Sequence, residues 1–417
     1  MHGISQSTLQ SILKPEAAGS NLLSVGVLTL TTEIQAEDFS VKPRKDFQRL
    51  PQLDTLRGFL LVWMTLTHLP THVSQYSNQM VGYVSAAEGF ILLAAILVSR
   101  IQQRLVTHEK LWRRIVRIYS YHLLLLGFAF SICAAVAARF DRVPLQNLLD
   151  FYLQHPKVAL IAAPALLYNP PLLDILPMYI VFMFLTPFIL GIAKRWGWGA
   201  VLIFSGSIWL LAQFNLRGWV YGAAAHCGFP IPLNEIGAFD LFGWQFLWTA
   251  GLYLGSSKAA SLFSKFRIAT WVVISSAAIA AVLFVCRHTA FDVLAGPTLF
   301  DVLVNKWRLG ILRQIDAVAI GILLMKYGSP LAETWLGRRL ATLGRASLEV
   351  FCTHLVFCFF FLGLATGTDA QYTWPQGVMI IAVTLTGLFA VAHLTQRFTQ
   401  RRAYDIGLCP HPLKVRN

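Results

Sequence analysis

Seven ionisable residues interrupt strongly apolar stretches of this 417-residue chain: Arg57, His68, Glu88, His122, Asp316, His354 and His393. Such side chains cost free energy inside a membrane, and by default they mark a functional site. A histidine exchanges a proton near neutral pH, whereas a carboxylate in apolar surroundings must be paired or protonated. Glu88 is therefore expected either to orient a histidine or to neutralise an arginine. For His68 the alternative is a packed, hydrogen-bonded position in the core.

Asp54 and Arg57 lie three residues apart, so their side chains can meet on a helix. A simple anchor for a helix end is the alternative explanation of this pair. His68 follows Arg57 by eleven residues, which is about 16 Å along a helix. We therefore expect His68 in the outer half of the membrane, away from Arg57.

Arg114 and Arg117 are also three residues apart and would share one helix face. Two guanidinium groups on one face suit a phosphate or pyrophosphate ligand. The alternative is that these arginines anchor a loop on the cytoplasmic side of a membrane.

The sequence does not indicate a metal site. His68 and His72 have the spacing of a helical zinc pair, but Pro70 lies between them and no third ligand is close in sequence. The six cysteines form no C-x-x-C motif, and most lie in apolar runs, where cysteine behaves as a small hydrophobic residue. We expect neither a metal nor a disulfide framework.

The composition defines the elements that must position these residues. Hydrophobic residues make up 56% of the chain and charged residues 13%, with a mean hydropathy of +0.58. Soluble domains carry about 25% charged residues. This shortage excludes an ordinary soluble enzyme, a disordered chain and a nucleic-acid binder, although the net charge is +14. The chain is expected to be an all-α, polytopic membrane protein.

A membrane-spanning helix needs about 20 mostly apolar residues. Ten runs approach this length: 53–69, 84–101, 118–138, 172–193, 199–216, 239–255, 268–286, 309–325, 348–365 and 377–394. With ten spans, 24 Lys and Arg residues fall on the side of the termini and 7 on the other side. By the positive-inside rule, both termini are then cytoplasmic.

The ends of the chain differ from the apolar region. The stretch 22–30 is too short to span a membrane, and only Lys14 precedes it, which is a poor signal peptide. We expect a flexible cytoplasmic tail at 1–45, a transmembrane domain at 46–400 and a basic cytoplasmic tail at 401–417.

Several short motifs occur in a fixed order along the apolar region. They are Leu53-Asp54-x-x-Arg57-Gly58, His68-Leu-Pro, Ser85-Ala-Ala-Glu88-x-Phe90, Leu176-Pro-Met-Tyr179, Trp244-Gln245 with Gly251 and Gly255, Gly344-Arg-Ala-Ser-Leu348 and His354-Leu355. Their order over residues 46–400 resembles the OpgC family. These are membrane acyltransferases associated with succinylation of osmoregulated periplasmic glucans, and they are related to the acyltransferase-3 type.

The resemblance implies a multi-pass protein of the bacterial inner membrane, in contact with membrane lipid, that uses acyl-CoA as a co-substrate and has no permanently bound cofactor. The acceptor would be a hydroxyl of a periplasmic glycan, and a hydroxyl needs an adjacent general base. His68 with Glu88 would then be catalytic, and His354 either a second proton-handling group or a structural donor. Arg57, Arg114 and Arg117 would bind the CoA phosphates. Asp54, Ser85 and Asp316 would support the site.

Two departures bear on the choice of acyl group and acceptor. Thr67 stands where relatives often have aspartate, and Ala94-Ala95 stands where they often have Ser-Gly. The alternative function is a secondary transporter or flippase for a polar solute, because many spans and buried ionisable groups suit that class too. Release of free CoA from acyl-CoA would distinguish the two.

Overall fold

The computed structural model describes residues 51–102, 109–265, 268–289, 299–365 and 372–405. Within these ranges the chain is helical and contains no strand, as the sequence predicts. The predicted tail at 1–45 and residues 406–417 of the other predicted tail lie outside the described ranges. Helix α19 (Trp374–Asp405) extends five residues into the segment predicted as the C-terminal tail.

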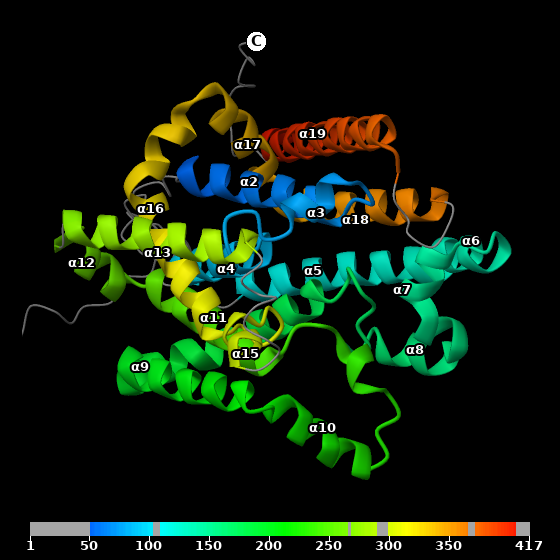
Figure 1. The fold of residues 1–417 in the computed structure, drawn as a ribbon, viewed down its shortest axis with the longest axis horizontal. Coiled ribbons are helices and arrows are strands. Elements are labelled where there is room, and N and C mark those ends of the chain that lie inside the picture. The colour runs from blue at the N-terminus through cyan, green and yellow to red at the C-terminus, as the bar shows by residue number, and fades with distance from the viewer. Residues whose placement is uncertain (1–50, 103–108, 266–267, 290–298, 366–371, 406–417) are drawn as a thin grey trace, which may run out of the picture. The chain divides into compact units, whose positions relative to one another are not determined.

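The helices follow one another along the chain in a single series (Figure 1). They are α2 (Pro51–His68), α3 (Val73–Ser77), α4 (Ala86–Gln102), α5 (Glu109–Phe128), the π-helix η1 (Ala129–Cys133), α6 (Ala134–Arg139), α7 (Val143–Gln154), α8 (Pro156–Ala162), α9 (Ile175–Gln213), α10 (Leu216–His226), the 3₁₀ helix η2 (Leu233–Ile236), α11 (Leu241–Leu254), α12 (Ser257–Lys265), α13 (Thr270–His288), α15 (Leu299–Val304), α16 (Ile311–Glu333), α17 (Trp335–Arg345), α18 (Ser347–Leu364) and α19.

Six helical stretches of the described residues are long and apolar enough to cross a membrane. They are Glu109–Arg139, Ile175–Gln213, Thr270–His288, Ile311–Glu333, Ser347–Leu364 and Trp374–Arg401. They correspond to seven of the ten predicted segments, because two of those segments lie in α9. The chain is thus an all-helical membrane protein.

The remaining three predicted segments form α2, α4 and α11, with 18, 17 and 14 residues. These helices are shorter than the about 20 residues needed to span a bilayer upright. The number of crossings and the side of the termini therefore stay predictions.

Helix α9 is two helices joined at a break. Gly197 has φ 83° and ψ 164°, a left-handed backbone conformation that glycine adopts without steric cost. The break lies between the predicted segments 172–193 and 199–216, directly after the basic residues Lys194 and Arg195. The two basic residues in the sequence thus mark the place where the helix is interrupted.

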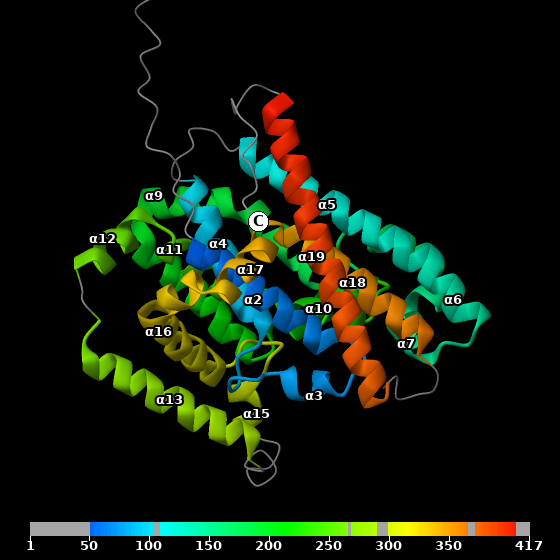
Figure 2. The same cartoon turned by 90° about the horizontal axis from the view of Figure 1, so that it is seen from above.

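Helix α2 packs closely against α17, and the two views show them side by side (Figures 1 and 2). A Cβ atom at Gly58 would overlap the carbonyl oxygen of Leu340, and one at Gly344 would overlap that of Asp54. Small residues allow helix backbones to approach in this way. This contact explains why both glycines occur in the motifs found in the sequence.

Helix α11 lies inside the bundle, whereas the long apolar helix α13 lies at its margin. On α11, Trp244 and Trp248 are fully buried, and this helix packs against α4 and α9. On α13, which packs against α16 (Figure 2), the large side chains of Trp271, Ile274 and Val282 are exposed. Exposed apolar faces of this kind suit contact with lipid.

Candidate functional site

A cavity of about 580 Å³ opens where the end of α2 meets the start of α4. The loops that precede α9, α11 and α16 complete its walls. Polar side chains from several segments line it. They include His68, Ser85, Asn169, Asp174, Asn234 and Lys306.

His68 is the last residue of α2 and lines this cavity. Its Nδ1 atom lies 3.4 Å from Nε2 of His354 on α18, and the two rings are stacked with their centroids 5.7 Å apart. His354 is fully buried, and its ring also contacts Phe351, which lines the cavity. The structure therefore brings two of the predicted catalytic residues together, with His354 behind His68.

The proton arrangement in this pair determines what His68 can do. A neutral imidazole has one nitrogen that donates and one that accepts. When Nδ1 of His68 donates to Nε2 of His354, Nε2 of His68 keeps a free lone pair. This tautomer is the one that can accept a proton from a substrate. His354 would then be a positioning residue, because it holds the tautomer and ring orientation of His68.

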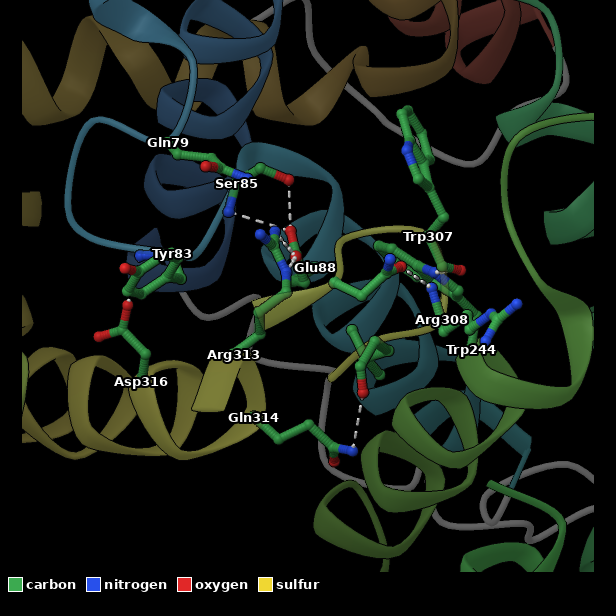
Figure 3. Close-up of polar contacts among 12 residues, drawn as sticks. Gln79, Tyr83, Ser85, Glu88, Trp244, Trp307, Arg308, Arg313, Gln314 and Asp316 are labelled. Atoms are coloured by element: carbon green, nitrogen blue, oxygen red, sulfur yellow. Dashed lines mark hydrogen bonds and ion pairs between the residues drawn. The ribbon is translucent and has the colours of Figure 1, made fainter. Parts of the chain in front are cut away.

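Glu88 pairs with Arg313 and not with His68, whereas a catalytic pair would need a contact with His68. Its Oε1 accepts from Nε of Arg313 at 2.9 Å and from Nη2 of the same residue, and its Oε2 accepts from Ser85 (Figure 3). Glu88 and Arg313 are both fully buried. Of the two roles expected from the sequence, the geometry corresponds to neutralising an arginine. Among the described residues no hydrogen bond joins Glu88 to His68.

Ser85 and Asp316 both tie down the segment that leads into α4. The backbone N–H of Ser85 donates to Glu88 Oε2 at 3.0 Å, and the N–H of Tyr83 donates to Asp316 Oδ2 at 2.8 Å (Figure 3). Gly82 has φ 117°, and a Cβ atom there would meet the Asp316 carboxylate. The geometry therefore suits the predicted supporting roles of Ser85 and Asp316.

Asp174 and Lys306 are cavity residues that the sequence did not single out. Asp174 precedes the membrane helix α9, and its Oδ2 accepts from the N–H of Ala238 at 3.2 Å. Burial raises the pKa of Asp174 to about 6, although backbone hydrogen bonds and Lys306 oppose that shift. Burial lowers the pKa of Lys306, and the Glu88 carboxylate opposes this.

A hydrogen-bonded loop closes one wall of the cavity. Arg217 donates to the carbonyl oxygens of Leu233 at 3.0 Å and Gly237 at 2.6 Å. Asn169 donates through its side chain to Ile236 O at 2.6 Å. The Asn169 bond connects the segment before α9 with the segment before α11, and the Arg217 bonds connect that second segment with α10.

The predicted phosphate-binding arginines lie on the first half of α2, which carries Arg57, and on α5, which carries Arg114 and Arg117. Arg57 interacts electrostatically with Arg114, Tyr179 and Asp54, and Nη2 of Arg114 donates to the Tyr179 hydroxyl at 2.8 Å. Two of the three arginines are thus neighbours.

The third arginine has a separate partner. Arg117 forms an ion pair with Glu349 on α18, and Asp54 lies 3.9 Å from Arg345. Arg117 is exposed, so its position corresponds at least as well to the anchoring alternative as to phosphate binding.

The model of the family described as OpgC protein matches residues 49–400. The chain belongs to the OpgC family. Membership in this family indicates a membrane transferase that modifies glucans. No curated protein and no solved structure matches the chain.

The OpgC match covers both ends of α2 and every residue of the cavity. Thr67, the first departure noted in the sequence, donates to Trp63 O at 3.0 Å within its own helix and lines the cavity. Ala94 and Ala95, the second departure, are buried, and Ala95 faces Gly251 of α11. Ala95 keeps the small size that the contact between α4 and α11 needs.

Sequence reasoning did not assign three charged residues to the candidate site: Asp174 and Lys306, which line the cavity, and Arg313, which pairs with Glu88. One available signal was that Lys306 is among only seven basic residues assigned to the outer side. Arg313 was one of the few basic residues placed inside an apolar segment. In the described ranges, no group of three or more His, Cys, Asp or Glu residues could hold a metal ion.

Proposed function

We propose that this protein is an O-acyltransferase of the bacterial inner membrane, related to acyltransferase-3-type enzymes. It transfers an acyl group, succinyl in the first instance, from cytoplasmic acyl-CoA to a hydroxyl of a periplasmic glucan. The observation that carries the proposal is His68: it lines a polar cavity while its Nδ1 faces a buried histidine.

In this reaction the acceptor oxygen attacks the thioester carbonyl carbon, and Nε2 of His68 takes the hydroxyl proton. The new C–O bond forms and the C–S bond breaks. The proton on His68 then passes to the departing thiolate, so that free CoA leaves with its thiol restored. A positioned general base of this kind contributes about 10²- to 10⁴-fold in rate.

Burial disfavours a charge on His68 before the reaction. The ammonium group of Lys306 adds to this effect, because it repels a second cation. His354 can accept a hydrogen bond from His68 without adding a negative charge. His68 would therefore carry a proton only transiently.

The donor would bind across the length of α2. Arg57 and Arg114 lie together at one end, where guanidinium groups suit the phosphates of CoA. His68 lies eleven residues further along, about 16 Å away along the helix axis. The long flexible arm of CoA would carry the thioester between these two points.

The test uses the purified full-length chain in lipid nanodiscs with succinyl-CoA and a linear or cyclic glucan. We expect release of free CoA that depends on the glucan, together with succinylated glucan detected by mass spectrometry. A transporter or flippase would release no CoA. Transport of glucan without CoA release would therefore replace the acyltransferase proposal.

A further inference from the structure

Lys306 lines the cavity, and in the proposed reaction its ammonium group contacts no substrate and only disfavours a charge on His68. It lies in the loop before α16, and its Nζ sits 5.1 Å from the centroid of the Trp307 ring. Among the described residues, Nζ forms no ion pair or hydrogen bond. A cation in a partly enclosed polar cavity has lost water and gains from an anionic partner.

The carboxylates near Lys306 are already engaged elsewhere. Glu88 binds Arg313 and Ser85, and Asp174 Oδ2 accepts from the Ala238 N–H. Both attract Lys306 electrostatically, but neither lies within the 4 Å of an ion pair with it. The Glu88–Arg313 pair balances its own charge. The ammonium therefore remains available to a negatively charged group that enters the cavity.

We propose that Lys306 binds an anionic group of the substrate, a carboxylate or a phosphate, and makes the protein selective for negatively charged substrates. This inference rests on the proposed function for the identity of the cavity as the reaction site. Two sources share this chemistry: the far carboxylate of a dicarboxylic acyl chain, or an acidic substituent on the glucan.

Binding can be measured without any reaction. The full-length chain in detergent is heated with monomethyl succinate or with methyl butyrate, which resembles it in length but has no charge. We expect only the anion to raise Tm. That increase should disappear in Lys306→Met and in Lys306→Gln and persist in Lys306→Arg. An equal response to both esters, or an anion response that survives Lys306→Met, overturns the proposal.

Kinetics then identify the source of the anion. A hydrogen bond to a charged group contributes about 1.5–3 kcal/mol, which is about ten- to a hundredfold in kcat/KM. If the acyl chain carries the anion, Lys306→Met lowers the ratio of kcat/KM for succinyl-CoA over butyryl-CoA by this factor. If the acceptor carries it, the ratio for a carboxylated over a neutral glucan falls instead. If neither ratio changes, the proposal is wrong.

Lys157→Met is the matched control, because Lys157 is an exposed lysine of α8 that does not line the cavity. It should leave both ratios and the anion-dependent rise in Tm unchanged. If the wild-type chain transfers no acyl group from either donor, the proposed function fails. The Tm experiment still decides the role of Lys306 in that case.

Discussion

The two ends of α2 have different surroundings. At its start, Asp54 and Arg57 lie close to arginines of α5 and α17 and to a tyrosine of α9, and a carboxylate of α18 pairs with a second arginine of α5. At its end, His68 lies beside a second histidine and a cavity. At the first end, cations have phenolic or acidic partners. At the second end lie two imidazoles, a lysine that forms no ion pair among the described residues, and the buried ion pair of Glu88 with Arg313. In the proposed reaction, the first end would bind the phosphates of CoA and the second end would transfer the proton.

The two ends also differ in how they are held. The first end depends on direct backbone contact, with Gly58 and Gly344 allowing α2 and α17 to touch. The second end depends on a buried network in which Arg313, Glu88 and Ser85 hold the start of α4 (Figure 3). Changes at the two ends should therefore give different kinds of defect, and the following predictions test that difference.

The largest effect is expected from His68→Gln. Glutamine keeps a hydrogen-bonding side chain but cannot act as a base, so acyl transfer should fall about 10²- to 10⁴-fold. Protein level and the KM for acyl-CoA should stay close to wild type. The measurement is glucan-dependent CoA release in nanodiscs.

His226→Gln is the control for this change, because His226 is an exposed histidine outside the cavity. His354→Gln should show a smaller loss and an altered pH profile, as expected for a positioning residue. Full activity of His68→Gln at normal protein level would remove His68 from the catalytic role.

Glu88→Gln should mainly affect stability. Removing one partner of a buried ion pair leaves the other charge uncompensated, which costs about 3–5 kcal/mol. We expect a large drop in thermal stability of the detergent-solubilised chain. The double variant Glu88→Gln with Arg313→Met should be less destabilised than the sum of the single variants. A stable but inactive Glu88→Gln protein would instead point to a direct catalytic role.

Asp174 should make stability depend on pH in an unusual direction. Its pKa of about 6 in the folded protein exceeds the ordinary value of 3.8, so the folded state binds the proton more tightly. The resulting stabilisation is present below about pH 4 and is lost as the pH rises through 6, with an amplitude of up to about 2–3 kcal/mol.

Comparing the thermal unfolding of wild type and Asp174→Asn between pH 4 and pH 7 measures this contribution. The variant should lack the component of the pH dependence that falls in this interval. Identical pH profiles of the two proteins would show that Asp174 ionises normally.

The smallest effect is expected from changes to the arginines near the first end of α2, and the roles of Arg114 and Arg117 should differ. Arg114→Ala should raise KM for acyl-CoA about tenfold, because it removes a charged hydrogen-bond donor. Lysine should rescue it only partly, since it lacks the planar fork. Arg117→Ala, which breaks the exposed ion pair with Glu349, should change KM less than Arg114→Ala. Equal increases in KM for the two variants would instead indicate that Arg117 also binds a phosphate of acyl-CoA.

Much of the fold was predictable because it depends on local composition. Apolar runs bounded by basic residues predicted helices at all ten positions, and Lys194 and Arg195 marked the interruption of α9 at Gly197. The number of crossings stays a prediction. Helices α4 and α11 have many side chains buried in the protein, and burial in protein and in lipid select the same residue types.

The sequence by itself determined the membrane class, the family and the separation of Arg57 from His68, because composition, motif order and helical rise are properties of the chain. Only the tertiary structure decided the partners: Glu88 meets Arg313 across 225 positions, and His68 meets His354 across 286. It also placed Lys306 beside the cavity. Apolar patterning specifies that a face is buried but not which helix covers it, so a buried charge acquires its partner, and with it its role, only when the helices pack.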